Sequence, residues 1–188
     1  MNMFCFQCQE TAGCKGCTRV GVCGKSAQTA GLQDLLIYVT KGLSDVATKL
    51  RKAGKKVGTD VNHLVTENLF ITITNANFDD EKITARIVDT LACKEALLAE
   101  LGSDAGLTEA AKWNGTEETF AEKAAQVGVL STENEDIRSL REMIVYGLKG
   151  MAAYSKHANA LGKESEAIDA FLQETLAKTL DDSLDVEA

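Results

Sequence analysis

The 188-residue sequence contains no proline, where average usage of about 5% would supply roughly nine. Because proline interrupts helices, its absence favours a mostly helical chain. No apolar run approaches the length of about 18 residues that a membrane-spanning helix needs, so we expect no membrane partner. The N-terminal stretch MNMFCFQCQE has neither a basic start nor an apolar core, and it does not resemble a secretory signal. These absences together predict a cytoplasmic protein.

Basic residues are also scarce, since 20 Lys and Arg stand against 28 Asp and Glu and give a formal net charge of −8. Residues 1–25 differ from the rest, because they contain Lys15, Arg19 and Lys25 against Glu10 alone. An acidic body argues against a nucleic-acid partner, because phosphate binding needs a basic face. The three cations of the first segment are either counter-charges for thiolates or solvated side chains on a loop.

What the chain does contain is a helical pattern of apolar residues. Over residues 31–53 these recur at steps of three and four, which forms one apolar face. The same period predicts a second helix over 60–74 and a third over 79–101. The β-branched run at 69–74 would also suit a short strand, but the longer period favours the helix. Residues 102–116 are predicted to be looser.

The pattern of the first two helices returns in the second half of the chain. LLIYVTKGL at 35–43 resembles MIVYGLKGM at 143–151, with matching Tyr, Lys and Gly residues at an offset of 108 residues. VTENL at 65–69 resembles LQETL at 172–176, with matching Glu residues at an offset of 107. Similar landmarks on two successive helices indicate an internally duplicated helical unit.

We therefore predict an all-α fold of two helical bundles with an N-terminal cysteine-rich loop. The predicted parts are a cluster-binding loop (1–30), a first bundle (31–104) and a second bundle (105–188). By the offset of the repeat, a third helix of the second bundle would begin near residue 186. A missing helix leaves an apolar face uncovered. We expect the chain to be a fragment of a longer protein or to be completed by a partner.

Five of the six cysteines lie in the first two dozen residues, at positions Cys5, Cys8, Cys14, Cys17 and Cys23, and the sixth is Cys93. In a reducing compartment, clustered cysteines serve as metal ligands or redox groups more often than as disulfides. The C-x2-C pair at the start can present two sulfurs to one site, and two later cysteines supply the other corners. Four thiolates suit either a structural zinc ion or an iron–sulfur cluster.

Three features favour iron–sulfur over zinc. The later cysteines are not a second tight pair, and no histidine precedes His63, which excludes the mixed Cys/His zinc patterns. The loop is also rich in glycine, which lets backbone N–H groups approach sulfur closely. A thioredoxin-like thiol motif is less favoured, because no strand precedes Cys5. Cys93 lies within a helical pattern and is predicted to be a small buried apolar residue.

The run MFCFQCQETAGCKGC…GVCGK, followed by LQDLLIYVTKG and TENEDIRSLREMIVYGLKGMAAY, resembles the N-terminal helical domain of the hybrid cluster protein family, also called hydroxylamine reductases. The resemblance implies a [4Fe–4S] cluster bound by Cys5, Cys8, Cys17 and Cys23. A second type of family member, with a longer spacing before its third cysteine, holds a [2Fe–2S] centre instead. Cys14 stands where the family commonly has glycine, so the choice between Cys14 and Cys17 as a ligand stays open.

The family reduces hydroxylamine to ammonia at a hybrid iron–sulfur–oxygen cluster, which later domains bind and for which this chain carries no ligands. The resemblance therefore implies an electron-transfer domain of an oxidoreductase that is inactive by itself. Its implied partners are an electron donor protein and the catalytic domains of the same family, in cis or in trans. Two alternatives stay open: a zinc-stabilised helical interaction module without redox activity, and a stand-alone electron-transfer protein.

Overall fold

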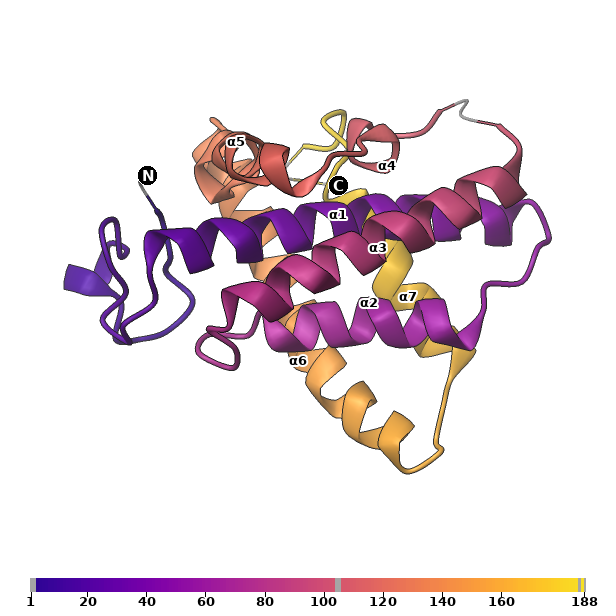
Figure 1. Cartoon of the computed structure of the whole chain (residues 1–188), viewed down its shortest axis with the longest axis horizontal. Coiled ribbons are helices and arrows are strands. Elements are labelled where there is room, and N and C mark those ends of the chain that lie inside the picture. The colour runs from indigo at the N-terminus through magenta and orange to yellow at the C-terminus, as the bar shows by residue number, and fades with distance from the viewer. Residues whose placement is uncertain (1–2, 104–105, 186, 188) are drawn as a thin grey trace.

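A computed structural model of the chain describes residues 3–103, 106–185 and 187, and these residues form the predicted all-α fold (Figure 1). The helices are α1 (Ala27–Lys52), α2 (Thr59–Ile71), α3 (Asp80–Leu101), α4 (Glu109–Lys112), α5 (Glu117–Val127), α6 (Glu135–Ala160) and α7 (Glu166–Lys178), with short 3-10 turns η1 (Ala12–Cys14) and η2 (Val129–Ser131). Among the described residues, the one extended pairing is an isolated bridge between Cys5 and Cys17. No helix of the described part is long and apolar enough to cross a membrane.

Two predicted boundaries differ from the structure, both through side-chain hydrogen bonds. The first helix begins at Ala27, inside the predicted loop 1–30, because the Ser26 side chain accepts the backbone N–H of Thr29 and caps it. The second helix ends at Ile71 rather than at residue 74. There the Thr72 hydroxyl donates to backbone carbonyls of the preceding turn, which competes with continuation of the helix.

The long helix α1 runs through the middle of the molecule, with α3 and α2 beside it (Figure 1). The main hydrophobic core joins buried residues of α1, α2, α6 and α7, such as Leu43, Val65, Leu148 and Leu172. Full burial of one such side chain contributes about 1.5–3 kcal/mol. The two predicted halves of the chain therefore share one core. The predicted boundary between residues 104 and 105 lies outside the described residues.

The helix bounds keep the two offsets that the sequence predicts. Helices α1 and α6 each have 26 residues and start and end 108 positions apart. Helices α2 and α7 each have 13 residues and stand 107 positions apart. The turns between the paired helices also match, because Gly54 and Gly162 both have positive φ values, of 75° and 66°. The duplication itself stays a prediction, and the further helix predicted near residue 186 falls outside the described residues.

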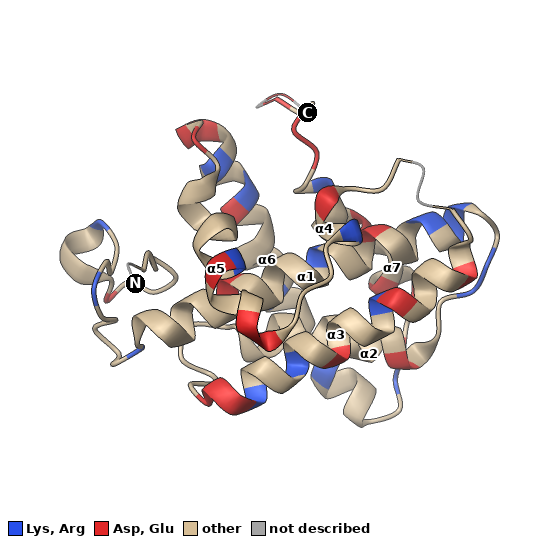
Figure 2. Cartoon of the chain, turned by 45° about the horizontal axis from the view of Figure 1, so that its top comes forward, with Lys and Arg blue, Asp and Glu red and all other residues tan. Residues whose placement is uncertain are grey.

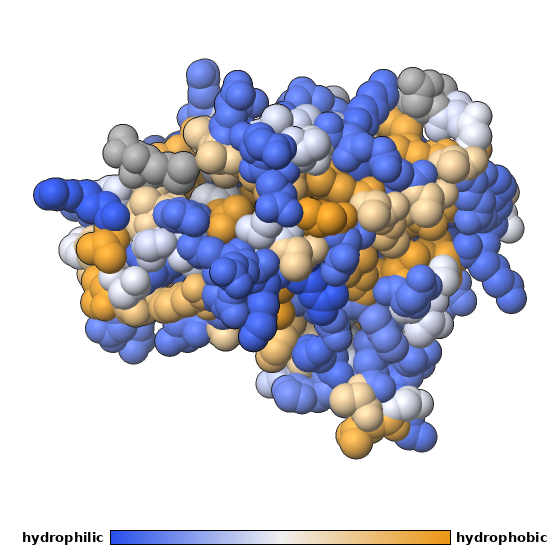
Figure 3. Space-filling view, viewed as in Figure 1, coloured by the Kyte–Doolittle hydropathy of each residue, from blue (hydrophilic) through white to orange (hydrophobic). Residues whose placement is uncertain are grey.

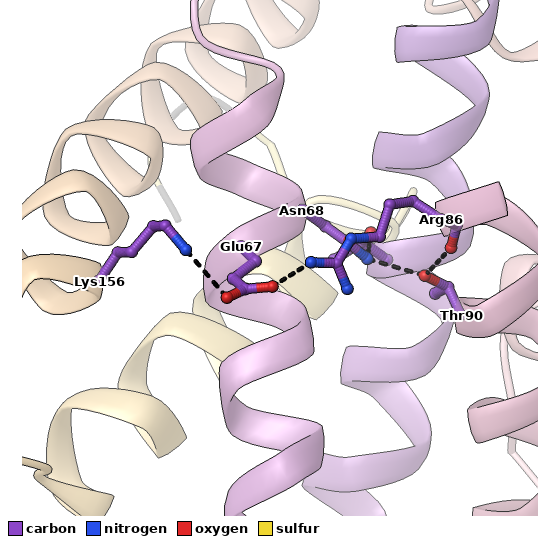
Figure 4. Close-up of polar contacts among 6 residues, drawn as sticks. Glu67, Asn68, Arg86, Thr90 and Lys156 are labelled. Carbon is purple, nitrogen blue, oxygen red and sulfur yellow. Dashed lines mark hydrogen bonds and ion pairs between the residues drawn. The ribbon is translucent and has the colours of Figure 1, made fainter. Parts of the chain in front are cut away.

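A polar bridge ties α2 to its two neighbours (Figure 4). Glu67 of α2 accepts a hydrogen bond from Arg86 of α3 and another, at 2.9 Å, from Lys156 Nζ of α6. Beside it, the buried Asn68 amide donates to Thr90 Oγ1 at 2.8 Å. Glu67 therefore orients α3 and α6 around α2. Elsewhere, charged residues of both signs are interspersed along the helices (Figure 2).

Candidate functional site: the cysteine loop

The cysteine-rich segment projects from one end of the molecule, at the start of α1 (Figure 1). Its two halves are paired, since Cys5 N donates to Cys17 O at 3.1 Å and Cys17 N donates to Cys5 O at 2.8 Å. Met3, Cys17 and Ala30 form a small buried cluster that seats the loop on α1. The fold thus brings Cys5 and Cys17, twelve positions apart in the sequence, into direct backbone contact.

Cys17 is the buried thiol of this loop. Its Sγ accepts the backbone N–H of Ala12 at 3.4 Å, and Thr11 Oγ1 lies 3.7 Å from the same sulfur. The backbone N–H groups of Ala12 and Val22 hold the pKa of the Cys17 thiol below its ordinary value; burial opposes them, while Thr11 and Lys25 add to the lowering. Hydrogen bonds of this kind favour a thiolate, which is the form that binds metals.

Cys14 has a different environment, with an exposed side chain and a φ of 56°. This left-handed region favours glycine, which gives a physical reason why glycine suits the position. At Gly16, φ is 123°, and an added Cβ would lie 2.5 Å from the Phe4 ring. The loop therefore needs glycine at residue 16 in order to pack on Phe4.

The remaining predicted ligands are less enclosed, because Cys5 and Cys8 are partly buried and Cys23 is exposed. Within the described residues, no group of three or more His, Cys, Asp or Glu side chains is placed so that it could hold a metal ion. The set of four cysteine ligands therefore stays a prediction. Cys93 packs partly buried against the main core, and burial raises the pKa of its thiol, which suits a packing role.

Two buried lysines lie beneath the loop, and sequence reasoning identified neither as buried. Lys25 is only 1% exposed, and its Nζ donates to Gln33 Oε1 at 2.7 Å. Lys149 of α6 is 3% exposed, and its Nζ donates to Gln7 Oε1 at 3.2 Å and to Thr72 O at 3.0 Å. Among the three cations considered in the sequence, Lys15 and Arg19 are exposed, so only Lys25 departs from a solvated role. A lysine inside the apolar run IVYGLKGMAAY was the available signal for Lys149.

A cavity of about 700 Å³ adjoins the loop, between the first helix and the segments around α5 and α6. Cys5 and Gln7 line it from the loop, and Asp34, Lys41 and Glu142 line it from the helices. Burial raises the pKa of Asp34 to about 7, although the charge of Lys149 opposes that change. Burial also lowers the pKa of Lys41. The helix side of this cavity, opposite the loop, therefore carries partly buried charged groups of both signs.

Comparisons with known proteins agree with the resemblance that the loop carries. The chain matches the Prismane/CO dehydrogenase family over residues 3–188. It is 58% identical over 185 residues to a hydroxylamine reductase of Desulfovibrio desulfuricans, which covers 98% of this chain and 34% of that protein. It is 56% identical over 194 residues to one of Clostridium perfringens, which covers 100% of this chain and 35% of that protein.

The chain spans about a third of the length of the curated relatives that it matches. A third relative, the hydroxylamine reductase of Acetivibrio thermocellus, is 53% identical over 188 residues. The family match covers almost the whole chain, so the resemblance predicted from the cysteine run is confirmed. This chain belongs to the Prismane/CO dehydrogenase family.

Proposed function

We propose that this chain is the electron-transfer domain of a hydroxylamine reductase and that Cys5, Cys8, Cys17 and Cys23 bind a [4Fe–4S] cluster. The observation that carries the proposal is the Cys17 thiol, which is buried, receives backbone N–H groups and pairs with Cys5. Membership in the prismane family, which implies iron–sulfur clusters, supports the same assignment. Identities of 49–58% to curated hydroxylamine reductases support the reaction class.

A bound cluster of this type accepts and donates one electron at a time. The chain's own residues prepare the loop for such an anionic group. Backbone N–H groups directed at the Cys17 sulfur stabilise the thiolate, and the glycine at residue 16 lets the loop close against Phe4. In the described structure, no backbone N–H is directed at the Cys14 sulfur. We therefore propose Cys17 rather than Cys14 as the third ligand.

We also propose that the remaining domains of a hydroxylamine reductase cover one face of α6. In α1, the buried residues Leu35 and Leu36 pack on α3 and α5 in one core cluster. At the offset of 108 residues, they correspond in α6 to Met143, which is 65% exposed, and to Ile144, which is also exposed. Helix α6 therefore leaves uncovered the face that α1 buries under α3.

The exposed apolar surface continues along α6. Tyr154 is 82% exposed, and hydrophobic surface shows at the tip of the molecule where α6 ends (Figure 3). This chain covers only 34–35% of the first curated relatives, so the part of each relative that it does not cover is about twice as long as the part that it does. An amphipathic helix from those domains, equivalent to α3, is the occupant that we propose. An electron donor protein is the other partner that the proposed function requires.

The proposed function is tested by iron, sulfide and zinc analysis of anaerobically purified protein, together with absorption spectra before and after dithionite. We expect iron and sulfide in equal amounts, about four of each per chain, and bleaching on reduction. One zinc per chain without sulfide, in protein made with iron available, would overturn the redox assignment in favour of a zinc-stabilised helical module.

The ligand assignment is tested with paired variants of neighbouring cysteines. Cys17→Ser is expected to lose or degrade the cluster, whereas Cys14→Ser retains the wild-type iron and sulfide content. The Cys14 variant is a matched control, because it removes a thiol from the same loop. A full cluster in Cys17→Ser, with loss in Cys14→Ser, would reverse the choice of ligand.

A further inference from the structure

In the part of the chain that the structure describes, the two buried lysines next to the cysteine loop have no carboxylate partner. Lys149 Nζ donates to the Gln7 side chain and to the Thr72 carbonyl, and Lys25 Nζ donates to the Gln33 side chain. Within the described residues, neither ammonium group forms an ion pair within 4.0 Å. Both cations are nevertheless almost completely removed from water. Such burial is unfavourable unless an anion compensates the charge.

The nearby carboxylates compensate Lys149 only in part. Burial lowers the pKa of Lys149 to about 8; Asp34, Glu142 and the Cys5 thiol oppose this lowering, and Lys25 adds to it. Asp34 is itself a weak counter-charge, because burial raises the pKa of its carboxyl to about 7. Burial thus favours the neutral form of both groups, because desolvation exceeds their mutual attraction. A further negative charge that compensates Lys149 would therefore come from the cysteine loop.

Lys149 also has a geometric connection to that loop. Gln7 lies between Cys5 and Cys8, and its Oε1 accepts both Lys149 Nζ at 3.2 Å and the backbone N–H of Thr74 at 3.2 Å. One side chain of the C-x2-C segment is thus held by α6 and by the turn after α2. A charge placed there acts on the loop from its buried side, where solvent screens it little.

We propose that Lys149 is a positioning residue that supplies a buried positive charge to the anionic iron–sulfur group of the loop and thereby favours its reduced form. This inference rests on the proposed function. Four thiolate ligands make the group anionic, and reduction adds one electron from an external donor and hence one more negative charge. A nearby buried cation is attracted more strongly to the reduced form than to the oxidised form. The charge of Lys25 also acts on the loop, through the Cys17 thiol.

The test compares reduction midpoint potentials, measured by anaerobic spectroelectrochemistry on protein of determined iron and sulfide content. Lys149→Met keeps the length of the side chain and removes the charge. We expect it to shift the one-electron reduction equilibrium at least tenfold toward the oxidised form, which is about 59 mV. Lys149→Arg keeps the charge and is expected to stay within about threefold of the wild type. The exposed Lys15→Met, in the same loop, is the matched control and is expected to shift the equilibrium less than about twofold.

The outcomes separate this inference from the function on which it rests. Wild-type protein without iron and sulfide would refute the proposed function, and the inference with it. The inference alone would be refuted if Lys149→Met kept the wild-type iron and sulfide content and its midpoint potential corresponded to a reduction equilibrium within about twofold of that of the wild type. If Lys149→Met loses the cluster, Lys149→Arg decides: retention with arginine supports a role of the charge, and loss with both substitutions refutes it.

Discussion

Lys94 offers a quantitative test of the packing between α3 and α4. Its side chain is 0% exposed, and its Nζ donates to Ala110 O at 2.9 Å and to Trp113 O. Burial lowers the pKa of Lys94 from 10.5 to about 8, with the charge of Glu95 acting in the opposite direction. Lys94 is thus a buried cation that carbonyl oxygens hold in place.

The sign of the resulting pH dependence follows from proton binding. The folded-state pKa lies below the unfolded value of 10.5, so the unfolded chain binds more protons at pH values between about 8 and 10.5. The folded state therefore gains stability as the pH rises through this window. A pKa difference of this size corresponds to about 3 kcal/mol in total, or about 1 kcal/mol per pH unit inside the window.

The perturbation is Lys94→Met, and the assay is urea unfolding followed by far-ultraviolet circular dichroism. Between about pH 7.5 and 9.5, the free energy of unfolding of the wild type is expected to rise by about 2 kcal/mol relative to that of the variant. Lys149 is present in both proteins, so its contribution cancels. The exposed Lys163→Met is the matched control and keeps the wild-type pH dependence. Parallel pH curves for the wild type and Lys94→Met would refute the reasoning.

Three further predictions concern the packing of the helices. Glu67→Gln is expected to lower the free energy of unfolding by about 1–2 kcal/mol in urea titrations. Burial raises the pKa of Glu67, but the cations of α3 and α6 outweigh it and hold this pKa below its ordinary value of 4.5. The difference in unfolding free energy between the wild type and Glu67→Gln therefore shrinks as the pH falls below 4.5. Equal stability of the two proteins at neutral pH would show that the bridge does not form. Gly42→Ala places a Cβ 2.2 Å from Ala110 O and is expected to lower the free energy of unfolding by about 1–3 kcal/mol. Gly150→Ala, whose added Cβ has nothing within 4 Å, is the control and is expected to lose no stability. Equal melting temperatures of the two variants would contradict this prediction. Met143→Glu is expected to change the free energy of unfolding of this chain by less than about 0.5 kcal/mol. It is also expected to weaken co-purification of the chain with the remaining domains of the Desulfovibrio desulfuricans relative. Unchanged co-purification would exclude this face of α6 as the contact.

The helices could be located from the sequence because burial repeats along each of them. The spacing of leucine and valine over residues 31–53 predicted α1, and core positions of that stretch such as Leu36 and Leu43 are fully buried, while Leu32 at its start is partly buried. The end of α2 was less predictable. It depends on a hydroxyl of Thr72 that bonds backward to the preceding turn, and the apolar period continues past that residue.

Within the cysteine loop, the sequence located the thiols, and the family resemblance implied Cys17 as the third ligand with Cys14 as the open alternative. The difference between them lies in the backbone, because Cys14 adopts a φ of 56° and faces solvent while Cys17 is buried and receives N–H groups. A spacing pattern counts residues between cysteines and contains no information on these dihedral angles. The proposal of Cys17 over Cys14 therefore draws on the folded loop as well as on the family resemblance.

The sequence by itself determined the all-α class, the helical stretches, the family and the segment that carries the thiols, because each of these is written in local order along the chain. Only the tertiary structure decided what surrounds that segment. Lys149 stands 142 positions from Gln7 and meets it through the packing of α6 on α2, and the two predicted halves prove to share one core. Contacts of this kind depend on which helix faces pack together. That packing depends on how all the apolar faces are buried simultaneously, which no local stretch of sequence specifies.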